Sequence, residues 1–421
     1  MSNKFKNNRN KKIYLSKVQD NNINDKKSKM KGEQKKEELP KIKVNQVNLQ
    51  DNKIQNNENN EIDTSNLGRY QNDNDLNKTK EKENIPKSIT ECLTGVQNIG
   101  QTCYMNAGLQ NIIHCIPFIN KLFSVIKLFD KIEDKPITNS FYNLCISLIK
   151  TENENTSFPP INFRKVFCQY HNAYSGNNQH DSLEFLRIFL NDISKELNQA
   201  KISNNYKELK TEGKSKKEQN YEYNNFYLSK ENSIVVKVFY SQIMNIFTCE
   251  CGDISYSFEK ILDIPLLFPK ENNNLNVNLK DLLNNYFNGE KVVWSSVCKK
   301  CRQQNLERNK KIKLSILPEV IIFSLLRFNP NTREKINNII KFEETIDLHS
   351  FCDKDIFNGD IYTKYKLFGI SNHSGTINFG HYYSYTKVGE NWYKFNDSFV
   401  KPVILNLSSE TAYFFFYEKM K

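Results

Sequence analysis

The spacing of apolar residues changes from a helical period to a strand-like period about halfway along the chain. Between positions 104 and 197, apolar side chains recur every three or four residues, which indicates amphipathic helices. The clearest pattern spans Asp181 to Leu197. Further helices are predicted at Tyr104–Phe118, Asn120–Lys131, Asn139–Lys150 and Phe163–His171.

Beyond position 233, apolar and polar residues alternate in short segments that are rich in β-branched and aromatic side chains, which is typical of strands. Strands are predicted at Ser233–Tyr240, Ile243–Cys249, Ile254–Leu262, Lys310–Leu317, Val320–Phe328, Tyr365–Ser371, His381–Val388, Trp392–Phe395 and Ala412–Tyr417. Helices come first and strands later, so the pattern predicts an α+β fold with a mostly antiparallel sheet.

Two segments show neither period. Residues 1–90 contain 20 Lys/Arg and 13 Asp/Glu, many Asn and few aromatic residues. Such a segment cannot bury enough apolar surface to offset its conformational entropy, so we expect a disordered tail. Residues 198–225 are rich in Lys, Asn and Glu, and we expect them to form a mobile insertion. The folded domain is then expected at 91–421.

The net charge of +12 does not by itself predict nucleic-acid binding. More than half of the excess lies in the first 90 residues, and no basic-aromatic recognition motif follows. No apolar run is long enough to span a membrane or to act as a secretory signal. We therefore expect a cytoplasmic or nuclear protein with no membrane partner.

Ten cysteines are present, and four of them form two close pairs. The first pair is Cys249 and Cys251, and the second is Cys298 and Cys301. In a reducing compartment this pattern indicates a metal site before it indicates disulfides.

Cys103 lies where a loop containing Gly100 enters a predicted helix. Backbone N–H groups at a helix N-terminus stabilise a thiolate and can hold an oxyanion. Asn98 precedes the cysteine by five residues, and its amide can donate a further hydrogen bond to an oxyanion. The alternative for Asn98 is an ordinary turn residue.

His381 follows a glycine-containing loop and begins a predicted strand. On the next predicted strand, Asn396 or Asp397 can accept a hydrogen bond from the far nitrogen of the imidazole ring. Cysteine, then histidine, then Asn or Asp is the order of papain-like thiol hydrolases. The three types of residue therefore predict a nucleophile, a base and an orienting group.

Several stretches together resemble the ubiquitin-specific proteases. Residues 95–110, Gly95 to Gln110, resemble the cysteine box of that family, and residues 365–400 resemble its histidine box. Gln179 to Leu186 resembles the intervening glutamine motif, and Leu317-Pro318 followed by Leu326-Arg327-Phe328 resembles the strand between fingers and palm. The order and spacing match over residues 91–421.

The resemblance implies a papain-like cysteine protease fold with a helical thumb, an antiparallel palm and zinc-ribbon-like fingers. Residues 233–328 would supply the fingers and the strands into the palm. It also implies a thiol-dependent deubiquitinase, which hydrolyses the isopeptide or peptide bond after the C-terminal glycine of ubiquitin without a catalytic cofactor. The expected partners are ubiquitin and ubiquitinated proteins, and the expected state is a monomer.

The resemblance assigns roles to individual residues. Cys103 would be the nucleophile, His381 the base and acid, Asn98 the oxyanion donor, Asn396 the orienting residue and Asp397 its fallback. Residues expected to bind the ubiquitin tail are Gln179, Asp181, Glu184, Gly380 and Tyr382. For Asp181 and Glu184 the simpler alternative is an acidic first turn that stabilises the helix dipole, and both can hold together.

The chain departs from the family pattern in two places. The family carries two Cys-x-x-Cys pairs; Cys298 and Cys301 fit, but Cys249-Glu250-Cys251 is one residue shorter. Structural zinc and a metal-free finger are both compatible with this spacing. Phe379 stands where a glycine often precedes the Gly-His pair. Two alternative functions also remain, a protease for a ubiquitin-like modifier and a catalytically weak ubiquitin-binding scaffold.

Overall fold

The computed structural model describes residues 91–129, 131–151, 157–200, 213–269, 276–295, 297–329, 334–357, 362–376 and 379–420. All of them belong to one structural unit. The expected disordered tail at 1–90 lies outside the described residues, and so does the 201–212 part of the expected insertion.

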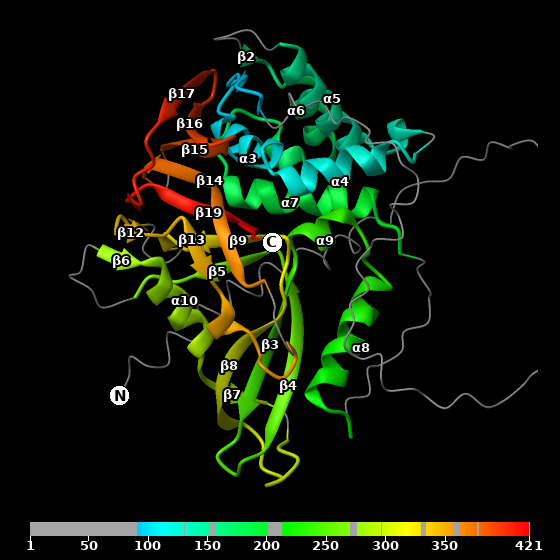
Figure 1. Cartoon of the computed structure of the whole chain (residues 1–421), viewed down its shortest axis with the longest axis vertical. Helices are drawn as coiled ribbons and strands as arrows, with labels where there is room; N and C mark the ends of the chain where they lie inside the picture. The colour runs from blue at the N-terminus through cyan, green and yellow to red at the C-terminus, as the bar shows by residue number, and fades with distance from the viewer. Residues whose placement is uncertain are drawn as a thin grey trace, which may run out of the picture. The chain divides into compact units, whose positions relative to one another are not determined.

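The first half of the described chain is helical (Figure 1). Its helices are α3 (Cys103–Ile113), α4 (Ile116–Ile126), α5 (Pro136–Lys150), α6 (Ile161–Tyr170) and α7 (Ser182–Glu196), with short 3₁₀ turns at Ile132–Asp134 and Asn172–Tyr174. Every residue of α3 is buried. This helix packs against α7 and α4 on one side and against strands of the central sheet on the other. The helical layer therefore covers one region of the sheet, as expected for the thumb.

The prediction of one helix over Tyr104–Phe118 is wrong. The helix ends at Ile113, and α4 starts at Ile116 after a bend of 82°. Pro117 does not end a helix but lies in the first turn of α4, where its missing N–H removes no intrahelical hydrogen bond. The predicted Asn120–Lys131 helix accordingly belongs to α4 and ends early, at Ile126.

Within the described ranges, no single helix has both the length and the apolar character that crossing a membrane requires. The bent pair α3 and α4 meets those criteria only when the two helices are joined.

The segment after the insertion also differs from the prediction. Residues Ser233–Tyr240 were expected to form a strand, but Ile234–Phe239 form the helix α9. The Ser233 side chain accepts a hydrogen bond from the Val236 N–H and caps this helix. Contacts with α4, α7 and the strand β9 (Val320–Leu325) bury its β-branched residues, so tertiary packing overrides local strand propensity.

Part of the expected insertion is helical. The helix α8 spans Lys216–Leu228 and begins with a capping box between Ser215 and Glu218. It lies beside the strand β4 (Ile254–Ile261). The sequence pattern did not predict this helix, and the mobility of the segment stays a prediction.

The central sheet has eight strands, in the order β17-β16-β15-β14-β19-β9-β5, with β13 also paired to β14. The strands are β5 (Asp263–Leu266), β9 (Val320–Leu325), β13 (Thr345–Asp347), β14 (Lys364–Gly375), β15 (Gly380–Val388), β16 (Asn391–Asn396), β17 (Phe399–Val403) and β19 (Ala412–Lys419). Among the described residues of this sheet, only the β5–β9 pair is parallel. The predicted mostly antiparallel sheet is thus confirmed.

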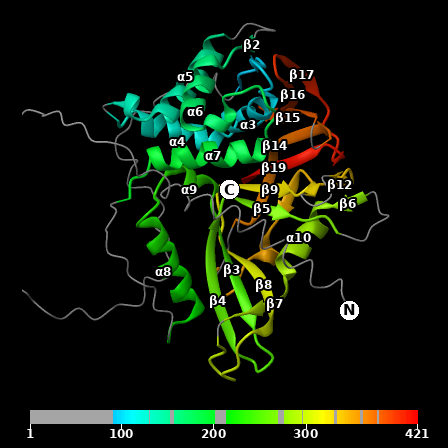
Figure 2. The same cartoon turned by 180° about the vertical axis from the view of Figure 1, so that it is seen from behind.

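A second sheet extends away from the first (Figure 2). Its four antiparallel strands, in the order β4-β3-β8-β7, are β3 (Ser241–Thr248), β4 (Ile254–Ile261), β7 (Glu290–Trp294) and β8 (Leu306–Ile316). The helix α10 (Leu279–Asn288) packs at its base. Neither α10 nor β7 was predicted. This outer sheet occupies the position expected for the fingers, so the α+β fold with thumb, palm and fingers is confirmed.

Shorter elements complete the described chain. They are β1 (Gly95–Val96) with β2 (Ser157–Phe158), β6 (Asn276–Asn278) with β12 (Ile339–Lys341) and β18 (Ser408–Ser409), β10 (Phe328–Asn329) with β11 (Glu334–Lys335), and a 3₁₀ turn at His349–Phe351. The predicted strand Val320–Phe328 is therefore divided between β9 and β10.

A bidentate ion pair joins the helical layer to the central sheet. Arg187 of α7 donates from Nε and an Nη to the two carboxylate oxygens of Asp263 on β5, over 2.8 and 2.7 Å. Ser324 of β9 donates to the same carboxylate over 2.5 Å. Such fork-shaped contacts fix direction as well as distance. They hold the N-terminal half of α7 in place relative to the sheet.

Candidate active site

The structure brings the two halves of the predicted catalytic centre together. Cys103 is the first residue of α3, and only 3% of its surface is exposed. His381 is the second residue of β15. Its hydrogen bond to Cys103, a second hydrogen bond to Asn396 and the nearby thiol charge outweigh burial and raise the pKa of His381 to about 9. This arrangement keeps the imidazole ring protonated at neutral pH.

The loop before Cys103 makes a sharp turn. Gly100 has a φ of 112° and Gln101 a φ of 55°, both in the left-handed region. A side chain at position 100 would come within 2.7 Å of Asn177 Oδ1. Glycine therefore fits this position for both its φ and its space, and the turn directs the chain into α3 at Cys103.

Asn396, at the end of β16, holds the imidazole ring. Its Oδ1 lies 2.5 Å from His381 Nε2. Because an amide oxygen only accepts, Nε2 carries the proton of this bond, and Nδ1 is left for the thiol. Asn396 thus fixes the tautomer and the direction of the ring.

Asp397 faces a different pair of side chains. Its Oδ1 accepts from Asn106 Nδ2 over 2.8 Å, and its Oδ2 accepts from Asn98 Nδ2 over 3.0 Å. Its backbone carbonyl accepts from the Val96 N–H over 3.0 Å. The carboxylate still adds a weak electrostatic increase to the pKa of His381. In this structure Asp397 holds the loop before the cysteine, and Asn396 contacts the ring.

Asn98 is oriented by four hydrogen bonds. Its Oδ1 accepts from the backbone N–H groups of Gly100 and Thr102, over 3.2 and 3.0 Å, and from the Thr102 hydroxyl over 3.3 Å. Its Nδ2 donates to Asp397. Because the oxygen is engaged with the loop, the amide N–H₂ group is directed to the other side. Asn98 also lines a cavity of about 340 Å³ together with His381.

Gln179 connects the two catalytic segments. Its Oε1 accepts from the Gly380 N–H over 3.0 Å, and its Nε2 donates to Gln101 Oε1 over 3.4 Å. Gly380 is required sterically, because a Cβ there would come within 1.9 Å of His373 Nε2. Gln179 therefore spans the gap between the loop before Cys103 and the strand of His381.

The acidic residues at the start of α7 have separate roles. Asp181 caps the helix, since its Oδ1 accepts from the Leu183 and Glu184 N–H groups over 2.8 Å, and its Oδ2 accepts from the Tyr413 hydroxyl. Glu184 lies in the first turn with its side chain exposed. Partial desolvation by neighbouring protein atoms, and then the charge of Asp181, raise the pKa of Glu184.

Tyr382 is buried beside the start of α7. Burial, and then the Asp181 charge, raise its pKa well above the ordinary value. Its ring packs near those of His373 and Tyr413. Tyr382 therefore supports the wall of the site from within rather than presenting its hydroxyl to solvent.

Sequence reasoning missed three residues of this network, Gln101, Asn106 and Tyr413. Asn106 is 3% exposed, and its Nδ2 also donates to the Val96 and Gln97 carbonyls. Helical spacing in the sequence could have identified Asn106, because it lies three residues after Cys103 and so on the same face of α3. Nothing in the sequence pattern pointed to Tyr413.

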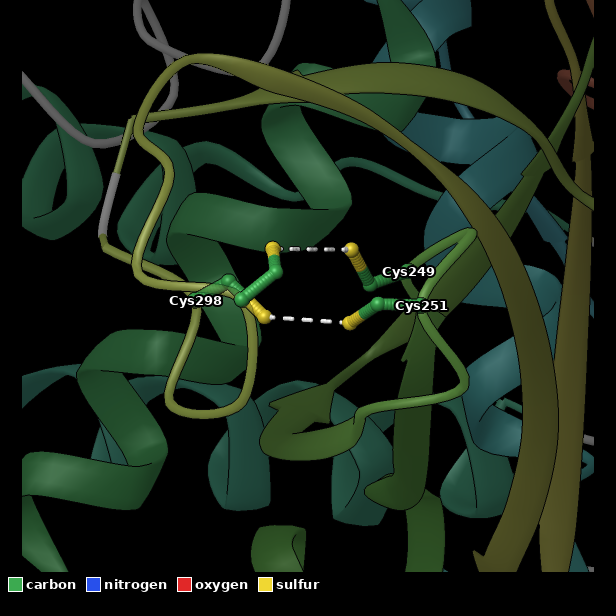
Figure 3. A group of neighbouring side chains, drawn as sticks. Cys249, Cys251 and Cys298 are labelled. Carbon is green, nitrogen blue, oxygen red and sulfur yellow. Dashed lines mark hydrogen bonds between the residues drawn. The ribbon is translucent and has the colours of Figure 1, made fainter.

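The four paired cysteines gather at the tip of the outer sheet. Their sulfur atoms lie within 4.8 Å of one another. Cys251 Sγ is 3.5 Å from Cys298 Sγ, and Cys249 Sγ is 4.0 Å from Cys301 Sγ. Figure 3 shows Cys249 and Cys251 on one loop, with their side chains directed toward that of Cys298 on a second loop. The cluster could bind a structural metal ion despite the shortened first pair.

A family model described as ubiquitin carboxyl-terminal hydrolase matches residues 94–417. Among curated proteins, ubiquitin carboxyl-terminal hydrolase Usp2 of Drosophila melanogaster is 28% identical over 78% of this chain and 35% of its own length. Ubiquitin carboxyl-terminal hydrolase 2 of Gallus gallus is 28% identical over 78% of this chain and 94% of its own length. The chain thus spans about a third of the fly relative and most of the chicken relative.

Two solved structures show the same fold. The SAGA DUB module Ubp8/Sgf11/Sus1/Sgf73 bound to monoubiquitin contains a chain with a TM-score of 0.63 at 23% identity, over 79% of this chain and 70% of that one. The same module bound to ubiquitin aldehyde gives a TM-score of 0.62 at 24% identity, over 79% and 71% of the two chains. At these identities the likeness supports the fold alone.

Proposed function

The chain belongs to the ubiquitin carboxyl-terminal hydrolase family, the thiol-dependent deubiquitinases. From this premise we propose that it hydrolyses the bond after the C-terminal glycine of ubiquitin with Cys103 as nucleophile. The observation that carries the assignment is the position of His381 between Cys103 and Asn396. The nucleophile therefore contacts the base, and the base contacts the orienting group, as thiol hydrolysis requires.

The first step is attack by the Cys103 thiolate on the carbonyl carbon of the terminal glycine. The carbonyl oxygen gains negative charge as the sulfur–carbon bond forms. N–H groups at the start of α3 and the amide of Asn98 are the donors for this oxyanion. Asn98 suits the role because Gly100 and Thr102 hold its oxygen and Asp397 accepts from one N–H, which leaves the second N–H as a donor for the oxyanion.

His381 then acts as an acid and afterwards as a base. The imidazolium gives its proton to the leaving amine when the carbon–nitrogen bond breaks, which leaves ubiquitin as a thioester on Cys103. The neutral ring next takes a proton from a water molecule that attacks the thioester, and the thiolate is released. Asn396 keeps the ring directed toward the sulfur through both steps.

The start of α7 and Gln179 supply the tail-binding side of the site. The ubiquitin tail is basic before its two glycines, and Glu184 is an exposed carboxylate in the first turn of α7. Asp181 acts mainly by capping α7 and by fixing Tyr413, so its charge supports the same surface indirectly. Gln179 and Gly380 bridge the two catalytic segments, and Tyr382 packs beneath them.

The metal in the outer sheet is proposed to be zinc. In a tetrahedral zinc site with Zn–S bonds of about 2.3 Å, neighbouring sulfurs lie about 3.8 Å apart. The sulfur distances of 3.5 and 4.0 Å lie on either side of that value. Cys249, Cys251, Cys298 and Cys301 would hold the ion, and its chemistry would be structural, joining two loops.

The proposed partners are ubiquitin and ubiquitinated proteins, bound by a monomer. A catalytic thiolate and four thiolate ligands need a reducing compartment, so we place the protein in the cytoplasm or the nucleus. Nucleic acid and membranes are not proposed as partners.

A ubiquitin molecule with a C-terminal electrophile tests the function. The purified chain should form one covalent adduct of the summed mass, and Cys103→Ala should form none. Cys352→Ser is the matched control, because Cys352 lies in a different core cluster from Cys103 and its thiol donates to the Leu348 carbonyl, a hydrogen bond that a serine hydroxyl can also make. The same probe built on ubiquitin-like modifiers should react far more slowly. Faster labelling by such a modifier would assign the enzyme to that substrate, and adduct formation by Cys103→Ala would remove the proposed nucleophile.

A further inference from the structure

The hairpin of β16 and β17 presents four side chains next to the catalytic histidine. We call this surface the hairpin face; it consists of Lys394, Asn396, Phe399 and Lys401. The strand register pairs Asn396 with Phe399 and Lys394 with Lys401. Because alternate residues of a strand point to the same side, the four side chains share one face.

Two adjoining hollows lie on the hairpin face. The first, of about 340 Å³, is lined by Gln97, Asn98, His381, Asn396, Asp397, Ser398 and Phe399. The second, of about 280 Å³, is lined by Lys394, Asn396, Phe399 and Lys401. Asn396 and Phe399 line both hollows, which therefore adjoin at these two residues; we call them together the depression, and its first part borders His381. Phe399 is 76% exposed between them, which is unusual for a large aromatic side chain.

The two lysines of the hairpin face lie directly opposite each other. Like charges in this position destabilise a strand pair. Lys394 Nζ lies 3.8 Å from the centre of the Tyr383 ring, and burial, then the Lys401 charge, lower the pKa of Lys394. In the part of the chain that the structure describes, neither ammonium group forms an ion pair with a carboxylate. By contrast, Lys387 of the neighbouring strand pairs with Glu390 over 3.1 Å.

The position of the leaving amine relative to His381 indicates which part of the substrate lies in this depression. His381 must lie within hydrogen-bond reach of the leaving amine in order to protonate it. None of residues 179–184, which belong to the proposed tail-binding side, lines either hollow. The acyl part of the scissile bond and the amine part leave the carbonyl carbon in different directions. The depression, whose first part borders His381, therefore faces the amine part.

We propose that the hairpin face binds the protein segment that carries the modified lysine, and that it favours acidic residues beside that lysine. The inference rests on the proposed deubiquitinase function and adds a substrate preference to it. Phe399 supplies an apolar contact for the aliphatic part of the segment, and the two uncompensated lysines supply attraction for its carboxylates.

Synthetic isopeptides test the preference. Ubiquitin is linked through its C-terminal glycine to the lysine of a short peptide whose flanking residues are Asp and Glu, and to the same peptide with Asn and Gln. A ubiquitin amide of a small fluorophore serves as the reference without a peptide. The full chain, Lys394→Gln/Lys401→Gln, Phe399→Ala and the control Lys341→Gln are compared by kcat/KM. Lys341 is exposed on β12, in a different sheet.

The wild-type chain should cleave the acidic isopeptide roughly threefold to tenfold faster than the neutral one, as expected for two partly exposed charge contacts. This ratio should fall to about one in the double lysine variant and stay at the wild-type value in Lys341→Gln. Raising the salt concentration should reduce it, because the contacts are near the surface. Phe399→Ala should lower the rates on both isopeptides relative to the fluorophore amide.

Several results would overturn the inference. One is an equal rate on both isopeptides in the wild type, and another is an acidic preference that survives in the double lysine variant. A strong preference for a second ubiquitin as the leaving group, independent of flanking charge, would also overturn it. No turnover of the fluorophore amide would instead contradict the proposed function itself, so the two failures are distinguishable.

Discussion

Asn396 Oδ1 lies 2.5 Å from His381 Nε2, whereas the carboxylate of the next residue, Asp397, accepts hydrogen bonds from Asn98 and Asn106. Two adjacent polar residues thus serve the two halves of the catalytic centre. Asn396 orients the base, and Asp397 holds the segment that carries the oxyanion donor. A neutral amide orients the imidazolium without offsetting its charge.

Replacing the nucleophile should abolish hydrolysis. Cys103→Ala should lower kcat on a ubiquitin C-terminal amide by about 10⁴-fold or more, because no other group takes over nucleophilic attack. Ubiquitin binding, measured by calorimetry or fluorescence anisotropy, should persist. Measurable turnover in this variant would refute the assignment of Cys103.

The two candidate orienting residues should differ in their effect. Asn396→Ala should lower kcat roughly 100-fold, because the imidazole loses its fixed tautomer and direction. Asp397→Ala should lower kcat less and should also lower the melting temperature, since Asn98 and Asn106 lose an acceptor. Steady-state kinetics and thermal unfolding separate the two effects. A larger loss of kcat in Asp397→Ala would transfer the orienting role to that residue.

Activity should extend to alkaline pH. The pKa of His381 is raised from 6.5 to about 9, mainly by its hydrogen bond to Cys103 and then by that to Asn396. The protonated ring is therefore present below pH 9 and is lost as the pH rises through that value, so kcat/KM should fall there. The raised pKa of His381 also stabilises the folded chain. This contribution to the free energy of unfolding is fully present below pH 6.5 and is lost as the pH rises through 9.

Two variants provide the control for this pH dependence. In Asn396→Ala the alkaline limb of kcat/KM should move to lower pH. In Cys103→Ala the pKa of His381, followed by NMR, should fall because its largest cause is removed. An unchanged histidine pKa in both variants would contradict the hydrogen-bonded pair.

Metal analysis of the purified protein should give about one zinc per chain. Cys301→Ser should lose the metal, and Cys168→Ser, whose thiol lies outside the cluster, should keep it. Prolonged chelation should lower the melting temperature, since the ion joins two loops. A metal-free preparation with unchanged stability and activity would show that the shortened Cys249–Cys251 pair does not support a site.

Removing the first residues should not affect chemistry. A chain that starts at Ser88 should fold and should hydrolyse ubiquitin conjugates at a rate close to that of the full chain. A chain that starts at Asn98 is the contrast, because it lacks buried Cys92, Thr94 and Val96 and the hydrogen bond from the Val96 N–H to the Asp397 carbonyl. It should unfold at a lower temperature. If the chain that starts at Ser88 keeps its fold but loses most of its kcat, residues 1–87 contribute to the site.

Local sequence was enough to predict a helical first half followed by a mostly antiparallel sheet, the family, and the candidate nucleophile and base. These features are local or depend only on residue type. A cysteine at a helix start lies beside free backbone N–H groups whatever the rest of the chain does, and an alternating pattern specifies a strand without reference to its partner. The helices α5, α6 and α7 and most central strands were predicted for this reason.

Features that depend on neighbours distant in sequence could be found only in the folded chain. Ser233–Tyr240 forms a helix because α4 and α7 surround it, and the chain bends after Ile113 where His114 bonds to the Gln110 and Cys92 carbonyls. The choice between Asn396 and Asp397 depends on the turn after β16, where Asp397 has a φ of 51°. That turn leaves Asn396 against His381 and directs the Asp397 carboxylate to Asn98.

The cross-strand pairing of Lys394 with Lys401 could not be predicted from the sequence either. Two lysines seven positions apart become direct neighbours only because the hairpin register pairs them. A strand pattern specifies which side a residue occupies, but it does not specify the residue on the adjacent strand. The register depends on where the hairpin turns, and it is this pairing that places charge and an exposed aromatic ring beside the catalytic histidine.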